Sequence, residues 1–253
     1  MDLTAIENLN IDRVIKRGTA QIIEKTDDAI LLKDTRSKAL MLACDDISKG
    51  MEILKQNIDD AKRNIGEAKP LIMISNAELG RMAADRFGYE NIMECYQMAY
   101  LSKEPPKPDK TDACENVGID ISTKSNSAQF DGILEYRVAT MENFPLISRE
   151  YGLVSEDELK ELIERGNIIM GYKTSEAVGF IGEHMEGSIG LLQVLEKHRR
   201  KGYSIALEMD MIRRTIEKGY IPFGQVVVGN TASLELQKKL GLTKSEGTIF
   251  WMW

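Results

Sequence analysis

The chain of 253 residues has few of the residues that build disulfides, metal sites or nucleic-acid surfaces. Its three cysteines, Cys44, Cys95 and Cys114, are an odd number without the paired spacing of a metal motif. We therefore expect reduced thiols in a cytosolic protein and no metal site. Acidic residues outnumber basic ones by 40 to 33, and the pI is near 5.1. This balance argues against non-specific binding of nucleic acid, and we expect no nucleic-acid partner.

Long apolar runs are also missing. No segment approaches the roughly 18 consecutive apolar residues that a membrane helix requires. Residues 1–10 lack the basic and then apolar pattern of a signal sequence. We therefore expect a cytoplasmic protein without membrane contact. The length suits one large domain or two small ones, each with a real core.

Proline is scarce, with six residues in the chain, but Pro105, Pro106 and Pro108 fall together at the start of a polar stretch. This change of composition predicts a linker at 105–131. The linker would separate an N-terminal domain, 1–104, from a C-terminal domain, 132–253.

The C-terminal half has a mixed pattern of short apolar runs and amphipathic segments, which predicts an α/β fold. Gly219 and Gly241 follow two amphipathic segments and predict where those helices end. The expected elements are a strand at 133–139, a helical region at 141–165, strands at 167–173, 177–184 and 188–195, a helix at 202–218, a strand at 222–229, a helix at 231–240, and a final strand or hairpin to 253.

A basic turn that contains Gly202 and Ser204 lies between the apolar run 189–194 and the helix that follows. The first amides of a helix have no internal partner and carry about half an elementary charge. Gly202 lets an anion approach the backbone, and successive turn amides can form a concave nest. The strand, cationic loop and helix N-terminus together predict a phosphate site. A solvated run of charge is the alternative.

Two segments, in this order, resemble motifs of the GNAT superfamily of acyl-CoA-dependent N-acyltransferases. Residues 199–204, RRKGYS, resemble its pyrophosphate loop, Arg/Gln-x-x-Gly-x-Gly/Ala. Residues 230–242, NTASLELQKKLGL, resemble its second motif, Asn-x-x-Ser-x-x-Leu-Tyr-x-Lys-x-Gly-Phe, and 222–242 are most similar to the glycine N-acyltransferase-like branch. Two motifs with the expected spacing are more specific than one. The resemblance covers about 134–253 and implies a mixed, largely antiparallel sheet flanked by helices.

The resemblance also implies acetyl-CoA, or another acyl-CoA, as the acyl donor. Main-chain groups of Gln193 and Val194 would pair with its pantetheine arm as an added strand pairs with a sheet edge. The loop amides would hold the pyrophosphate, and the start of the helix after Gly229 would contact the arm. A plain helix cap is the alternative for Asn230. The implied residues are Gln193, Val194, Arg199, Arg200, Lys201, Gly202, Tyr203, Ser204, Asn230 and Ser233.

One departure from the family pattern affects the departing thiolate. Gln237 stands where the family often has a tyrosine that protonates this thiolate, and an amide cannot act as that acid. Tyr203, Tyr220 or a water molecule could replace it. A thiol is also a reasonable leaving group without help.

Two acidic residues are candidates for the general base, and the sequence does not decide between them. The amine must lose a proton, and the candidates are Glu183 and Glu186, which flank His184. The alternative is a hairpin turn with solvated acids at these positions. The catalytic glutamate of the glycine acyltransferases falls near Ser188, so that role is not clearly kept.

The N-terminal half repeats the order of the later elements. Residues 49–50 and Pro70 precede residues 201–202 and Pro222 by 152 positions in both cases. We expect a tandem with a degenerate first copy, and therefore two GNAT-like mixed sheets flanked by helices, with chance similarity as the alternative. The expected elements are strands at 18–25, 29–33 and 39–44, a helix at 47–64, a strand at 71–75, a helix at 77–87, and a strand at 92–101.

Charge separates the two copies. Where the later copy has basic residues at 198–200, the first has Asp46 followed by two neutral residues, with Asp45 just before it. Two carboxylates repel a pyrophosphate, so we expect no CoA site in the N-terminal half.

Together these features predict an N-acetyltransferase for a primary amine of a small molecule or an amino acid. The alternative is a non-catalytic module that binds CoA or acyl-CoA, and longer acyl groups stay open. Trp251 and Trp253 alternate on the last strand. They predict core closure or, as the alternative, a subunit contact in a homodimer.

Overall fold

The computed structural model describes residues 2–65, 69–106 and 134–253, without the side chains of 59–65. The predicted linker at 105–131 lies almost entirely outside these residues, as does Cys114. Within the described part of the chain, no helix has the length and apolar character to cross a membrane.

The N-terminal half contains every element that the sequence predicts there, with ends within two residues of the expected ones. It also contains a short helical segment at its start, η1 and α1, which the sequence analysis missed because polar Asn10 and Arg13 are buried among its apolar residues. The elements are η1 (Ile6–Asn8), α1 (Leu9–Lys16), β1 (Ala20–Lys25), β2 (Ala29–Asp34), β3 (Leu40–Cys44), α2 (Ile47–Ile65), β4 (Ile72–Ile74), α3 (Ala77–Phe87) and β5 (Ile92–Ala99).

The C-terminal half also follows the predicted order. Its helical region is divided by Tyr151, which is extended, and Ser155 caps the next helix by accepting from the Glu158 amide. The elements are β6 (Glu135–Val138), η2 (Met141–Asn143), α4 (Phe144–Glu150), α5 (Glu156–Glu164), β7 (Ile168–Lys173), β8 (Glu176–Glu183), β9 (Ile189–Val194), η3 (Glu196–His198), α6 (Tyr203–Glu217), β10 (Phe223–Val227), α7 (Thr231–Lys239), β11 (Thr243–Lys244) and β12 (Ile249–Met252).

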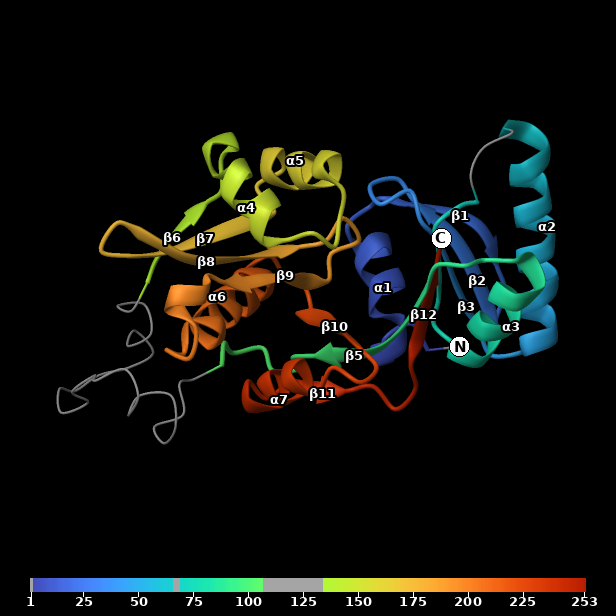
Figure 1. Ribbon diagram of the computed structural model, residues 1–253. Coiled ribbons are helices and arrows are strands. Elements are labelled where there is room, and N and C mark those ends of the chain that lie inside the picture. Colours follow the sequence, from blue (N-terminus) through green and yellow to red (C-terminus); the bar gives the residue numbers. More distant parts are fainter. Residues whose placement is uncertain (1, 66–68, 107–133) are drawn as a thin grey trace.

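The strands of both halves form one sheet, in the order β1-β2-β3-β4-β12-β5-β10-β9-β8-β7-β6, with β11 paired to β5 (Figure 1). Most neighbours are antiparallel; the parallel pairs among the described strands are β3 with β4 and β9 with β10. The expected class, a mixed and largely antiparallel α/β fold, is confirmed. The two expected sheets are joined edge to edge into one.

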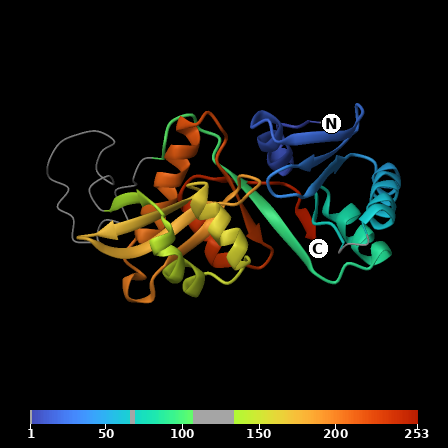
Figure 2. The same cartoon turned by 90° about the horizontal axis from the view of Figure 1, so that it is seen from above.

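The junction exchanges strands between the halves. The last strand of the chain, β12, lies between β4 and β5, where Phe250 is opposite Ile74 on one side and Glu94 on the other. In turn β5 separates β12 from β10 and pairs with β10 from Ala99 opposite Phe223 to Cys95 opposite Val227. Figure 2 shows β5 running between the two halves. Each half is therefore completed by a strand of the other.

Strand β12 supplies both faces of the N-terminal core. Phe250 and Met252 pack with residues of α2 and α3, and Ile249 and Trp251 pack with residues of α1 on the opposite face. Trp251 also donates its indole N–H to Gln225 Oε1 at 2.8 Å. Core closure is therefore confirmed for Trp251, whereas Trp253 lies beyond the strand and is 47% exposed.

Helices cover both faces of the C-terminal part of the sheet. Figure 1 shows α4 and α5 on one side and α6 on the other. Leu207 and Ile212 of α6 pack against Ile181 and Val226 of the strands. On the opposite face Leu162 of α5 joins a second buried cluster. Strands β9 and β10 therefore belong to a sheet with helices packed on both faces, and α6 begins shortly after the C-terminal end of β9.

Candidate functional site

Strands β9 and β10 diverge at the centre of the C-terminal half. Strand β9 pairs with β8 from Ile189 to Val194, but with β10 it has a single registered pair, Ile189 with Gly224. Past that pair, no described strand hydrogen-bonds to β9 on this side. A cavity of about 360 Å³ opens beside the free edge, lined by Leu192, Gln193, Val194, His198, Arg199, Arg200, Gly202, Tyr203 and Ser204.

The cavity ends at the N-terminus of α6. Gly202 is the N-cap residue and has a φ of 77°, a left-handed conformation that favours glycine. Because Gly202 has no side chain, it leaves the first helix amides uncapped. The preceding Arg200 also has a positive φ, 60°. The loop thus turns consecutive amides toward a site where an anion can be held without a competing side-chain cap.

Basic side chains surround this opening and are tied to the loop itself. Arg199 donates from Nε to the Val194 carbonyl at 3.1 Å, and Lys201 donates to the Lys197 carbonyl at 3.0 Å. Both residues are exposed, so their charge is available to a ligand in the cavity. Desolvation lowers the pKa of the buried His198, whose ring lies edge-on to Tyr203 at 6.2 Å. His198 is therefore a neutral packing residue at pH 7.

The structure gathers most of the predicted cofactor residues but not all of them. Lys201, Asn230 and Ser233 are not among the residues that line the cavity. Asn230 caps α7 by accepting from the Ser233 amide at 3.1 Å. Leu192 and His198 line the cavity and were not predicted. Leu192 could have been found because it precedes two predicted residues on the same strand.

A β-bulge re-aims β9 beside the cavity. Leu191 has a φ of 51°, and the pairing with β8 skips one residue between Phe180 and Gly182. Two residues of β9, Leu191 and Leu192, therefore face Ile181 alone. Bulges of this kind bend a strand and redirect its side chains and amides. No pattern in the sequence marked this position, because the left-handed residue is not a glycine.

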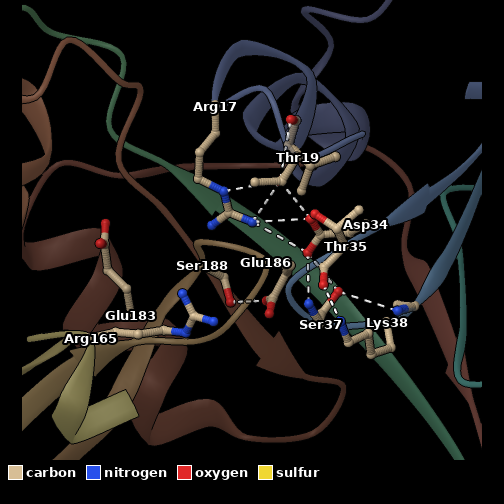
Figure 3. A network of polar contacts seen from close by, with 12 residues as sticks. Arg17, Thr19, Asp34, Thr35, Ser37, Lys38, Arg165, Glu183, Glu186 and Ser188 are labelled. Atoms are coloured by element: carbon tan, nitrogen blue, oxygen red, sulfur yellow. Dashed lines mark hydrogen bonds and ion pairs between the residues drawn. The ribbon is translucent and has the colours of Figure 1, made fainter. Parts of the chain in front are cut away.

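Ionisable residues gather behind the bulge. The buried Glu186 accepts a hydrogen bond from the Ser188 hydroxyl, as Figure 3 shows. Burial raises the pKa of Glu158 on α5, with His184 opposing this rise and Glu186 adding to it. Burial also raises the pKa of Tyr151, which has a backbone hydrogen bond with Leu191 and feels the charges of both glutamates. These groups can bind and deprotonate a cation next to the bulge.

The other acid predicted as a base, Glu183, has a different environment. Its carboxylate pairs with Arg13 at 3.2 Å and Lys218 at 3.1 Å, and Oε1 also accepts from Thr215. Burial raises the pKa of Glu183, but the charges of Arg13 and Lys218 outweigh it and the net shift is downward. A carboxylate held in this way is a weak base. The geometry favours Glu186 for proton transfer.

Gln237, at the position of the family's tyrosine, is buried and donates its amide to Glu208 of α6. Burial raises the pKa of Glu208 to about 7, and Gln237 only partly opposes this. The unpaired buried atoms Glu208 Oε2 and Gln237 Oε1 belong to the same two groups. The sequence analysis missed Glu208, although an acid between Leu207 and Met209 on the apolar face of a helix is a signal.

The corresponding position of the N-terminal half is acidic. Asp46 precedes α2 and its carboxylate accepts from the Lys49 amide at 2.7 Å, which occupies a helix amide that a phosphate would need. A cavity of about 270 Å³ nearby has Glu7 and Asp45 among its lining residues and no basic side chain. Throughout the described residues, no group of three or more His, Cys, Asp or Glu is placed to hold a metal ion.

Comparison with known proteins finds a family match over the segment that contains the cavity. Residues 168–251 match a family described as FR47-like protein. No curated protein matches the chain. One similar solved structure is a Drosophila melanogaster protein with 17% identity and a TM-score of 0.58, and the match covers 98% of this chain and 89% of that chain. A GCN5-related N-acetyltransferase from Kribbella flavida has 10% identity and a TM-score of 0.56, with 98% of this chain and 93% of that chain covered. A GCN5-related N-acetyltransferase-like protein from Streptococcus suis has 14% identity and a TM-score of 0.53, with 96% of this chain and 93% of that chain covered.

At these identities the solved structures establish a shared fold over nearly the whole chain. The family match covers the segment from β7 to β12. This segment contains the diverging strands β9 and β10 and the helix α6 with its uncapped N-terminus. The chain therefore shares its fold with the GCN5-related N-acetyltransferase structures, and its C-terminal third matches the FR47-like family.

Proposed function

We propose that the protein is an acyl-CoA-dependent N-acyltransferase. It transfers an acetyl or other short acyl group to a primary amine of a small molecule or an amino acid. One observation carries this proposal: the uncapped N-terminus of α6 lies at the end of a cavity beside the edge of β9 that β10 leaves free. An elongated ligand that ends in a pyrophosphate suits this combination.

The acyl donor would bind with its pyrophosphate on the amides that follow Arg199. Each charge-assisted hydrogen bond there contributes about 1.5–3 kcal/mol. Its pantetheine amides would pair with the free edge of β9 at Gln193 and Val194, as an added strand does. The edge is free only because β10 leaves β9 after Ile189. The thioester would then lie near the bulge at Leu191.

The amine would be deprotonated by Glu186. This acid is buried and held by Ser188, two residues away and near the predicted position of the family's base. Glu158 could also accept the proton, because burial raises its pKa and the charge of Glu186 adds to this rise. In the reaction the amine nitrogen attacks the thioester carbonyl carbon and loses one proton, the C–S bond breaks, and the thiolate gains one proton. A general base of this kind contributes about 10²–10⁴-fold in rate.

The N-terminal half would serve the reaction without binding acyl-CoA. Its element order, with β3 parallel to β4 and followed by α3 and β5, matches that of β9 to β12. This order supports a tandem duplication in which the first copy lost its phosphate site. The Asp46 cap on α2 supports the loss.

Calorimetry with CoA and acetyl-CoA tests the binding step, and thiol release over an amine panel tests the transfer. We expect micromolar binding that is weakened at least tenfold in an Arg199→Ala/Arg200→Ala variant, from the loss of two charge-assisted bonds. A matched control, Lys25→Ala/Lys33→Ala, removes two exposed basic residues from β1 and β2, at the opposite end of the sheet. Binding without thiol release for any amine would support the alternative, a non-catalytic module. No heat with either form of CoA would refute both.

A further inference from the structure

Arg13 belongs to α1 of the N-terminal half, but its guanidinium lies in the C-terminal half. The residue is 3% exposed. Nη1 pairs with Glu183 Oε1 at 3.2 Å, and Nη2 donates to the Ile221 carbonyl at 3.2 Å. These two contacts join the end of β8 to the segment just before β10.

Aromatic and glycine contacts fix the rest of the side chain. The guanidinium carbon lies 4.4 Å from the ring centre of Tyr220 and 5.5 Å from that of Phe223. A Cβ on Gly187 would lie 2.7 Å from Arg13 Cγ, so the stem of Arg13 fills the space of the missing side chain. Gly187 has a φ of 103°, which also requires glycine.

One side chain of the other half, Arg13, therefore contacts the β8–β9 turn at two points. Glu183 precedes the turn and Gly187 lies within it, directly after Glu186. The turn is closed by its own backbone bonds, from the Gly187 amide to His184 and from the His184 amide to Ser188. These bonds tie residues 184–188 together, and Arg13 links the turn to the segment before β10.

We propose that Arg13 is a positioning residue that places Glu186 for proton transfer from the amine. This inference rests on the proposed function, because it assigns a role in that reaction to the N-terminal half. Arg13 does not line the acyl-CoA cavity, whose lining residues belong to β9, η3, the loop at 199–202 and the start of α6. Its effect is therefore confined to the amine side.

Arg13→Met tests the proposal, because methionine keeps much of the stem and removes the charge. Arg17→Met is the matched control. Arg17 follows the same helix and is also largely buried in an ion pair, with Asp34 at 3.3 Å, and Thr19 completes a network within the N-terminal half (Figure 3). Since Arg13→Met leaves Glu183 short of a partner, Arg13→Met/Glu183→Gln removes both charges and restores the fold if the single variant is unstable.

We expect Arg13→Met to lower kcat at least tenfold and to change the Kd for acetyl-CoA less than twofold, whereas Arg17→Met changes neither by more than about twofold. We also expect about tenfold faster hydrogen exchange at amides 184–188 in Arg13→Met, measured with no substrate present. The double variant should refold without regaining kcat or turn protection.

Unchanged exchange of the turn in both variants would overturn the positioning role, as would equal losses of kcat in the Arg13 and Arg17 variants. A different pattern would appear if only the proposed function failed. The wild-type protein would then release no thiol with any amine, but exchange of the turn would still rise in Arg13→Met and not in Arg17→Met.

Discussion

The buried acid Glu208 gives the sharpest prediction about stability. Its pKa in the folded protein is about 7, against 4.5 for a free glutamate. In this range the unfolded chain binds fewer protons than the folded one, so stability falls as pH rises from about 4.5 to about 7 and is level above that. At 1.36 kcal/mol per pKa unit, the shift corresponds to a loss of about 3 kcal/mol.

Glu208→Gln removes this dependence and keeps the shape of the side chain. The new amide still accepts from Gln237 and has an N–H for the unpaired Gln237 oxygen. We expect the variant to match the wild type in free energy of unfolding at pH 4.5. At pH 7.5 it should be more stable, by up to about 3 kcal/mol. Urea unfolding at four pH values between 4.5 and 8 measures this difference.

The difference between the two proteins is the informative quantity, because every other acid titrates equally in both. Glu196→Gln is the control, since that side chain is exposed and its substitution should give a difference that does not vary with pH. If Glu208→Gln gave a constant difference across the pH range, or a stability below that of the wild type at pH 7.5, burial of a protonated acid would be refuted.

Three further predictions concern the site and the junction. Gly202→Val should weaken acetyl-CoA binding at least tenfold, because its φ of 77° strains a branched residue and the Cβ blocks the amides; unchanged affinity by calorimetry would contradict this. Glu186→Gln should lower kcat by about 10²–10⁴-fold with unaltered acetyl-CoA affinity, and a retained kcat would remove it as the base. Residues 134–253 produced alone should not give a cooperative unfolding transition, because β10 lacks its partner β5; adding residues 2–106 in trans should restore one, and a folded fragment would argue against the exchange.

Local structure could be predicted closely from the sequence. Apolar runs bounded by glycine or proline predicted the strands, and residues such as Asn230, which accepts from the Ser233 amide, marked a helix start. The short helix α1 was missed because burial of Arg13 and Asn10 depends on contacts with distant segments. The seven predicted residues that line the cavity lie within one contiguous stretch, 193–204, so local reasoning was enough for them.

Long-range pairing could not be predicted in the same way. The pattern of Ile249 to Met252 predicts a strand buried on both faces, and it is satisfied equally by any apolar neighbour. Nothing local determines that β4 and β5 are those neighbours. For the same reason, Glu183 and Glu186 look alike in the sequence, and what distinguishes them is the pairing of Glu183 with distant residues, Arg13 and Lys218.

The exchange of strands between the halves also constrains the order in which the chain can fold as it is synthesised. A ribosome completes β1 to β5 long before it reaches β12, yet β12 is the strand that fills the gap between β4 and β5. Until β12 has been synthesised, the first half of the nascent chain therefore has two strand edges without their native partner, one on β4 and one on β5. Its part of the sheet can be completed only after the C-terminal elements have been made, so the two halves cannot reach their native structures independently.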